Sequence, residues 1–175
     1  FQDSLAAYKQ GEIVRAKTLL ENELEINPLD SNVLGLLATI EKALCNNERA
    51  AQLFEASLRI DQSNPDILHN YAGLLQFDDL DKAIELSNMS IVASPNNCIY
   101  LERNGYLKWK SGDLNGSLQI TLKALEIDSN RADSYLNLGR VYKQLGNLDK
   151  ALSATLKSLD LNSGCAATLL SLGGI

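Results

Sequence analysis

Apolar residues recur along this chain at intervals of three and four, the spacing that places side chains on one face of an α-helix. The clearest stretch holds Tyr135, Leu138, Gly139 and Tyr142. After a break at Gly146, a second run keeps this spacing with Leu148, Ala151, Leu152, Thr155 and Leu159. The pattern predicts two helices of roughly 12–15 residues, a length that is marginal in isolation, so their stability must come from stacking.

The same pair of helices repeats along the whole chain. Small residues predicted for the middle of each second helix are separated by 34, 33, 34 and 34 residues: Ala16, Ala50, Ala83, Ser117 and Ala151. A position in each first helix has the same separations, and it holds Leu34, Leu68, Leu101, Tyr135 and Leu169. Both series share a one-residue deletion near 77–79, where a turn glycine is missing. Chance does not give this agreement, so the chain is predicted to be an array of helical repeats.

Turn and cap residues fall where the apolar runs stop. Gly146 suits a left-handed C-terminal cap, and Asn147 can accept a hydrogen bond from the first turn of the next helix. The equivalent capping positions in three other repeats hold Asn46, Asp79 and Asp113. Pro28 and Pro95 follow two of the second helices and prevent them from running on.

One position in each first helix is always small: Ala38, Ala72, Gly105, Gly139 and Gly173. A minimal side chain there allows the paired helices to approach closely. We therefore expect Gly139→Leu to destabilise the fold by roughly 1–3 kcal/mol through overpacking, despite its gain in helix propensity.

The stretch from Tyr135 to Tyr142, followed by Gly146 and Ala151, resembles the tetratricopeptide repeat (TPR). The resemblance covers 1–175 as one array, with repeats at 1–30 (partial), 31–64, 65–97, 98–131 and 132–165 and the first helix of a further repeat at 166–175. It implies an all-α fold, a right-handed solenoid of antiparallel helix hairpins. The first helices of such a superhelix line a concave groove that binds a protein or peptide.

Two repeats depart from the pattern of this family. Cys45 replaces the turn glycine of the second repeat, and Asn104 and Lys108 stand in the fourth where the family prefers an apolar residue and a tyrosine. These departures concern local packing and leave the predicted fold unchanged.

Charge and composition narrow the possible functions. A net charge of −6 argues against nucleic-acid binding, which needs a basic face. The three cysteines are dispersed, with no CxxC pair, so we expect no metal site or disulfide framework and a cytoplasmic location. No apolar run approaches the ~18 residues of a membrane span. His69 is the sole histidine and is expected to face the groove, so we expect neither an enzyme nor a cofactor.

Projecting the repeat onto the first helices selects the residues expected to line the groove. They are His69, Asn70, Phe77, Arg103, Tyr106, Trp109, Lys110, Asn137, Arg140, Lys143 and Gln144. The stretches 98–111 and 132–145 carry net charges of +2 and +1 within an acidic chain. A basic, aromatic-bearing face predicts binding of an acidic or extended peptide. In the alternative, Trp109 packs between repeats and the basic residues pair with nearby acids.

The resemblance allows two further comparisons. Chaperone-binding members of the family hold a terminal carboxylate with a Lys and an Asn one turn apart, and that clamp is not present here. The corresponding pairs are His69/Gly73, Glu102/Tyr106 and Leu136/Arg140. Members attached to O-GlcNAc transferases grip the peptide backbone with a ladder of asparagines, of which Asn70 and Asn137 match two rungs.

These observations predict a protein-interaction scaffold. Two alternatives remain open. The chain starts and stops inside predicted helices, so it is expected to continue in both directions and could be the targeting arm of an enzyme such as a glycosyltransferase or sulfotransferase. The apolar residues of 166–175 could also drive self-association.

Overall fold

The structure is a computed structural model that describes residues 1–162, and within this range it holds ten α-helices and no strand. The helices are α1 (Gln2–Lys9), α2 (Ile13–Ile26), α3 (Ser31–Ala43), α4 (Asn47–Ile60), α5 (Pro65–Leu75), α6 (Leu80–Ala93), α7 (Cys98–Ser111), α8 (Leu114–Ile127), α9 (Ala132–Gln144) and α10 (Leu148–Leu161). The helix predicted for 166–175, and the self-association predicted through it, lie outside the described residues.

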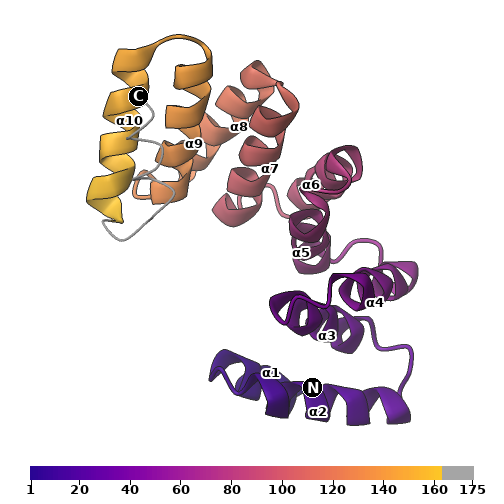
Figure 1. The fold of residues 1–175 in the computed structure, drawn as a ribbon. Helices are drawn as coiled ribbons and strands as arrows, with labels where there is room; N and C mark the ends of the chain where they lie inside the picture. Colours follow the sequence, from indigo (N-terminus) through magenta and orange to yellow (C-terminus); the bar gives the residue numbers. More distant parts are fainter. Residues whose placement is uncertain (163–175) are drawn as a thin grey trace.

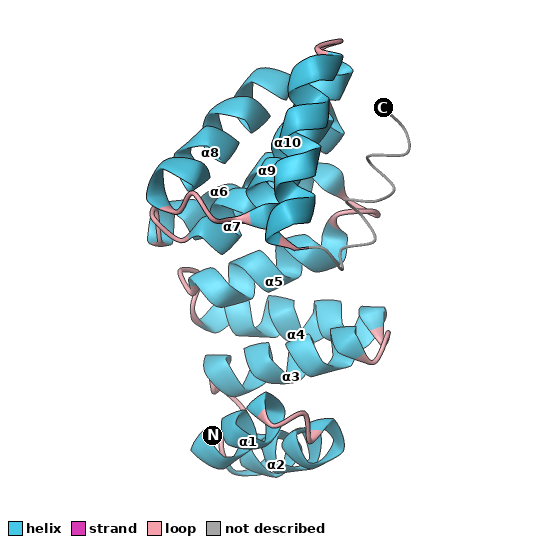
Figure 2. Ribbon diagram, turned by 90° about the vertical axis from the view of Figure 1, so that its left-hand side faces the viewer, coloured by secondary structure: helices cyan, strands magenta, loops and turns pink. Residues whose placement is uncertain are grey.

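Consecutive helices pair as hairpins, α1 with α2 through to α9 with α10, and the second helix of each hairpin packs on the first helix of the next. Figure 1 shows the hairpins stacked along a curved path from the indigo N-terminus to the yellow α10, and Figure 2 shows the layers from the side. The first helices also contact one another in succession, α3 with α5, α5 with α7 and α7 with α9. They therefore form one continuous surface. This architecture confirms the predicted all-α solenoid.

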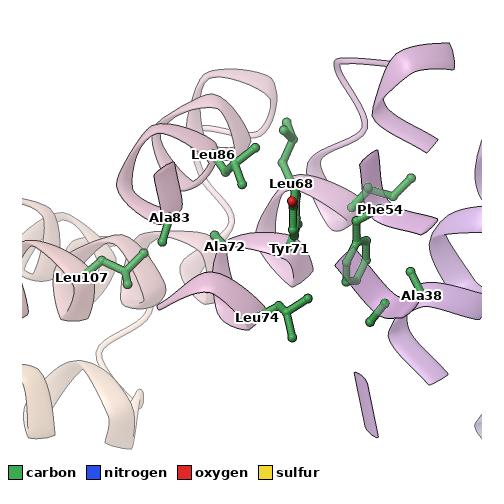
Figure 3. Close-up of a cluster of buried hydrophobic side chains, with 11 residues drawn as sticks. Ala38, Phe54, Leu68, Tyr71, Ala72, Leu74, Ala83, Leu86 and Leu107 are labelled. Carbon is green, nitrogen blue, oxygen red and sulfur yellow. The ribbon is translucent and has the colours of Figure 1, made fainter. Parts of the chain in front are cut away.

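The core lies between the hairpins. The repeated small residues Ala16, Ala50, Ala83, Ser117 and Ala151 are all completely buried. Between the second and third hairpins, Phe54 of α4 stacks on Tyr71 of α5 with ring centroids 5.3 Å apart, and Leu68 lies in the same cluster (Figure 3). Burying one such side chain stabilises the fold by about 1.5–3 kcal/mol. These contacts between repeats supply the stability that single short helices lack.

Left-handed residues close most of the hairpins, and Gly146 is in this conformation as the sequence predicts. Gly11, Gly112 and Gly146 have φ of +78°, +88° and +76°. Cys45, in the equivalent position, adopts φ of +62°. The turn after α5 contains no residue of positive φ, which agrees with the missing turn glycine. There Leu75 O accepts hydrogen bonds from two consecutive backbone N–H groups instead.

The cap predictions hold at three of the four positions. Asn147, Asp79 and Asp113 each accept a hydrogen bond from a backbone N–H three residues on. The prediction for Asn46 is wrong, because its amide Nδ2 donates to Glu41 Oε2 at 2.7 Å and its side chain makes no cap. The predicted helix length is also too long for α5, with 11 residues, whereas α1, with 8, belongs to the repeat that was predicted to be partial.

Polar contacts accommodate the departures in the fourth repeat. Asn104 is 1% exposed, and its Nδ2 donates to Asn88 Oδ1 at 2.8 Å and to Ser87 Oγ at 3.3 Å. Lys108 forms an ion pair of 3.0 Å with Asp113 at the start of α8. The fourth hairpin therefore keeps the packing of its neighbours with a partly polar interface to α6.

Candidate binding groove

A cavity of about 360 Å³ opens between α5, α7 and α9 on the surface formed by the first helices. It brings together five of the residues predicted to line the groove: His69, Arg103, Tyr106, Asn137 and Arg140. Their spacing along the sequence follows the repeat, so each first helix contributes side chains at the same level of the stack. We refer to this cavity as the cationic cavity.

The other predicted residues lie around the cationic cavity or apart from it. Asn70 lines a neighbouring cavity of about 400 Å³ between α1, α3 and α5. Trp109 packs beside Tyr106, with ring centroids 5.7 Å apart. Phe77 is 72% exposed, and Lys110 Nζ lies 4.0 Å from the centre of its ring. Lys110 also donates to the backbone oxygen of Gln76. The remaining two, Lys143 and Gln144, are exposed and line neither cavity.

Arg103 is the central side chain of the cationic cavity. Its Nη1 donates to Gln76 Oε1 at 3.2 Å, whereas its buried Nε has no hydrogen-bond partner. Within residues 1–162, no carboxylate forms an ion pair with Arg103. Burial lowers the pKa of Arg103, and the charges of Tyr106 and Asp133 only partly oppose this shift. The guanidinium is thus a cation held partly away from water without an acidic partner.

Arg140 of α9 lies over the aromatic pair of α7. Its guanidinium carbon is 5.2 Å from the centre of the Tyr106 ring and 5.5 Å from that of Trp109. The indole Nε1 of Trp109 is buried and has no hydrogen-bond partner. Trp109 is therefore half-buried between Tyr106 of its own helix and Arg140 of α9, and Arg140 lines the cavity next to it.

His69 lies on α5 between two cations. Burial, and then the charges of Arg103 and Lys42, lower the pKa of His69 to about 4. The ring is consequently neutral at neutral pH, and it packs against Tyr100 with ring centroids 5.1 Å apart. Its buried Nδ1 has no hydrogen-bond partner.

The sequence analysis missed Lys42 of α3. Its Nζ donates to the backbone oxygen of Asn70 at 3.2 Å and faces the guanidinium of Arg103 across Gly73. The repeat itself contains the signal that finds it: the series Lys42, Gln76, Trp109 and Lys143 has separations of 34, 33 and 34. The projection began at the third repeat and therefore left out the second.

Glu102 does not neutralise this surface, although it lines the cationic cavity. Arg131 donates to its two carboxylate oxygens at 3.0 and 2.6 Å, and Ser134 Oγ donates at 2.9 Å. The hydrogen bonds that Arg131 donates to Glu102 raise the pKa of Arg131. Because its carboxylate is occupied, Glu102 links α7 to α9 and leaves Arg103 unpaired.

The two asparagines of the predicted ladder differ in their contacts. Asn137 is 3% exposed, its Nδ2 donates to Glu102 O at 2.9 Å, and its Oδ1 accepts from Arg140 at 3.0 Å. Its amide therefore already has one donor and one acceptor engaged within the protein. Asn70 is half-buried beside the neighbouring cavity, where its amide can meet a peptide backbone.

Residues 1–162 contain no group of three His, Cys, Asp or Glu side chains arranged to hold a metal ion. None of the ten helices is long and apolar enough to cross a membrane.

Comparison with known proteins agrees with this architecture. A family model described as tetratricopeptide repeat matches residues 120–153. A TPR repeat-containing protein of Methanocaldococcus jannaschii is 30% identical over 95 residues, which are 53% of this chain. This chain spans only 16% of the length of that relative.

Solved structures of low sequence identity share the fold. YrrB, described as a TPR protein with an unusual peptide-binding site, is 20% identical with a TM-score of 0.78, covering 96% of this chain and 87% of its own. PilW, a type IV pilus biogenesis factor, is 19% identical with a TM-score of 0.85, covering 97% and 80%. MamA of Desulfovibrio magneticus RS-1 is 15% identical with a TM-score of 0.80, covering 94% of each chain.

Proposed function

We propose that this chain, in which residues 120–153 match the tetratricopeptide repeat, is a protein-interaction scaffold that binds an extended or acidic peptide segment along the surface of its first helices. The observation that carries the proposal is the cationic cavity. Arg103 lines this cavity and Lys42 approaches Arg103 above Gly73; both are half-buried without an ion-paired carboxylate among residues 1–162, on a chain whose net charge is −6.

The charge distribution of the chain favours an acidic partner at this surface. An acidic chain repels nucleic acid and most anionic surfaces, whereas a local cationic cavity attracts a complementary segment. Of the two carboxylates that line the cavity, Glu102 is occupied by Arg131, whereas Asp133 is exposed on α9. Asp66 of α5 accepts a hydrogen bond of 2.6 Å from the hydroxyl of Tyr100. The cavity therefore presents hydrogen-bond donors to a partner.

The groove has two sections with different chemistry. The section between α1, α3 and α5 is lined partly by apolar side chains, including Leu5, Leu36 and Ile67. The cationic cavity between α5, α7 and α9 follows it along the stack. Such an arrangement suits an extended segment that carries apolar and acidic side chains. Tyr106 and Trp109 beside the cavity are of the residue types that anchor interfaces. YrrB, which shares this fold, is described as having a peptide-binding site, and this also supports the proposal.

Selection from a random peptide display library on the immobilised protein tests the proposal. We expect enrichment of peptides that contain Asp or Glu, and loss of their capture by a variant in which Arg103→Gln, Trp109→Ala and Arg140→Gln are combined. Retention of the selected peptides by this variant would exclude the groove as their site. The matched control is Arg59→Gln with Lys157→Gln, which removes the same charge from exposed positions on the second helices α4 and α10. This control should capture the same peptides as the wild type.

A further inference from the structure

Two cationic side chains, one from the repeat before α5 and one from the repeat after it, meet above Gly73. The Nζ of Lys42 and the guanidinium carbon of Arg103 are each 3.0 Å from the point that a Cβ on Gly73 would occupy, and Arg103 Nη2 is 3.1 Å from it. His69 lies one helical turn before Gly73 on the same helix, α5. The missing side chain leaves a small space that two cations face, one from α3 and one from α7.

The hydrogen-bonding capacity of this space is not used by the protein. Arg103 Nε and His69 Nδ1 are buried and without a partner among residues 1–162. Leaving a buried polar group unpaired costs about 1–3 kcal/mol, and more when the group is charged. The contacts that Lys42 and Arg103 do make are to neutral oxygens, the Asn70 carbonyl and Gln76 Oε1. One ligand that accepts several hydrogen bonds would satisfy all three side chains at once.

The electrostatics of the space favour an anion. Burial and the charge of Arg103 lower the pKa of Lys42, and burial lowers that of Arg103, so the two cations disfavour each other. The acidic side chains whose charges act on this group are Asp66, which the Tyr100 hydroxyl occupies, and Asp133, which is exposed on α9. An added anion would be stabilised by both cations.

We infer that Lys42, His69 and Arg103 form a receptor for one carboxylate side chain, an Asp or Glu of the segment bound in the groove. The inference rests on the proposed function and names the chemistry that the segment must bring. The guanidinium edge formed by Nε and Nη2 matches the two oxygens of a carboxylate, because Nη1 is already occupied by Gln76. Lys42 Nζ supplies a further donor from the other side of Gly73, and the neutral ring of His69 can donate from Nδ1.

This receptor differs from the Lys–Asn clamp in its construction. The clamp takes two residues one turn apart on one helix, and here those positions on α5 are His69 and Gly73. The receptor takes one cation from the repeat before α5 and one from the repeat after it. Its geometry therefore depends on the stacking of three hairpins.

NMR titration of the ¹⁵N-labelled protein at pH 6.5 tests the inference, with sodium acetate as the probe and sodium chloride at equal ionic strength as the reference. We expect acetate to shift the Arg103 Nε–Hε resonance saturably and chloride to leave it unchanged. Lys42→Gln should weaken the acetate effect at least fivefold. The matched control Lys157→Gln removes an exposed charge from the second helix α10, outside the first-helix surface, and should leave the effect intact. Equal responses to acetate and chloride would overturn the inference.

A second anion and a steric variant define the ligand further. Methyl phosphate that binds tenfold or more tightly than acetate would overturn the assignment to a carboxylate in favour of a phosphorylated side chain. Gly73→Ala places a methyl group in the space and should abolish the acetate response. The displaced atoms are the flexible ends of Lys42 and Arg103, so this variant should stay folded, as its circular dichroism will show. If the acetate response survives in folded Gly73→Ala, the receptor is not above Gly73.

The acetate titration and the library selection can fail independently of each other. Protein that selects acidic peptides but does not respond to acetate at Arg103 retains the proposed function and loses the inferred receptor. Protein that responds to acetate but selects no peptide has an anion site without the proposed function.

Discussion

At the scale of single residues, the backbone conformation of Cys45 is one that glycine adopts with less strain. Cys45 adopts φ of +62° where other hairpins have glycine. A non-glycine residue in the left-handed region destabilises the folded state by about 1–2 kcal/mol. Glycine avoids this penalty but loses more conformational entropy on folding, which offsets about 0.5–1 kcal/mol of the gain. We predict that Cys45→Gly raises the free energy of unfolding by up to about 1 kcal/mol, measured by urea denaturation. Gly146→Ala is the reciprocal control and should lower it. A destabilised Cys45→Gly would contradict this account of the turn.

Gly139 illustrates close packing within a hairpin. A Cβ at this position would lie 2.4 Å from Thr155 Oγ1 on α10, so we predict that Gly139→Ala destabilises the protein by about 1–3 kcal/mol, despite the better helix propensity of alanine. Thr155→Ala removes the opposing atom. In a double-mutant cycle by urea denaturation, the cost of Gly139→Ala should be smaller in the Thr155→Ala background. Additive effects would show that the contact is not the cause.

His69 makes stability depend on pH in a defined window. Its pKa in the folded protein is about 4, whereas its ordinary value is 6.5. Between these values the unfolded chain binds a proton that the folded protein does not, so stability falls as the pH is lowered from about 6.5 to 4. We predict that His69→Gln reduces the loss of stability between pH 7 and pH 5, measured by the urea midpoint at each pH.

The same titration can be followed directly. His69 is the only histidine in the chain, so its ring signals in an NMR spectrum are unambiguous. A measured pKa near 6.5 would contradict the burial and the charge environment described for this ring.

At the scale of helices, Glu102 links two repeats. Its buried carboxylate on α7 accepts hydrogen bonds from Arg131 and from Ser134 of α9. Removing it leaves those donors unpaired, so we predict that Glu102→Ala lowers the free energy of unfolding by about 1.5–3 kcal/mol. Asp160→Asn, which removes an exposed partner of Lys157, is the control, with an expected change within about 0.5 kcal/mol. A loss as small as that of the control would show that the link does not stabilise the stack.

The helices were predictable from sequence because local chemistry determines them. The spacing of apolar residues gives the hairpins, and Gly146 and Asp113 mark their ends at the predicted positions. Asn46 shows the limit of this reasoning. The side chain of a cap residue can form a hydrogen bond with other partners than the next helix. Here the amide of Asn46 donates to the carboxylate of Glu41, which tertiary packing buries nearby. Only the fold reveals that competition.

At the scale of the whole molecule, the position of the groove was predictable but its charge balance was not. The repeat placed His69, Arg103, Tyr106, Asn137 and Arg140 at one cavity. Counting charges along a helix could not show that Glu102 pairs with Arg131 and Lys108 with Asp113. Nor could it show that Lys42 of the preceding repeat lies close to Arg103. Those facts depend on which hairpins stack together.

In the proposed function, the stacked first helices form the binding surface, with Arg103 at its centre. The single tryptophan, Trp109, lies next to the cationic cavity, so its fluorescence can report a bound segment. The most direct test is a fluorescence titration of the wild type and of Arg103→Gln with a library-selected acidic peptide and its acid-to-amide analogue. The account predicts saturable binding of the acidic peptide to the wild type, weakened at least about tenfold, or about 1.4 kcal/mol, by either change. Equal affinity for the acid and amide peptides, unaffected by Arg103→Gln, would contradict it.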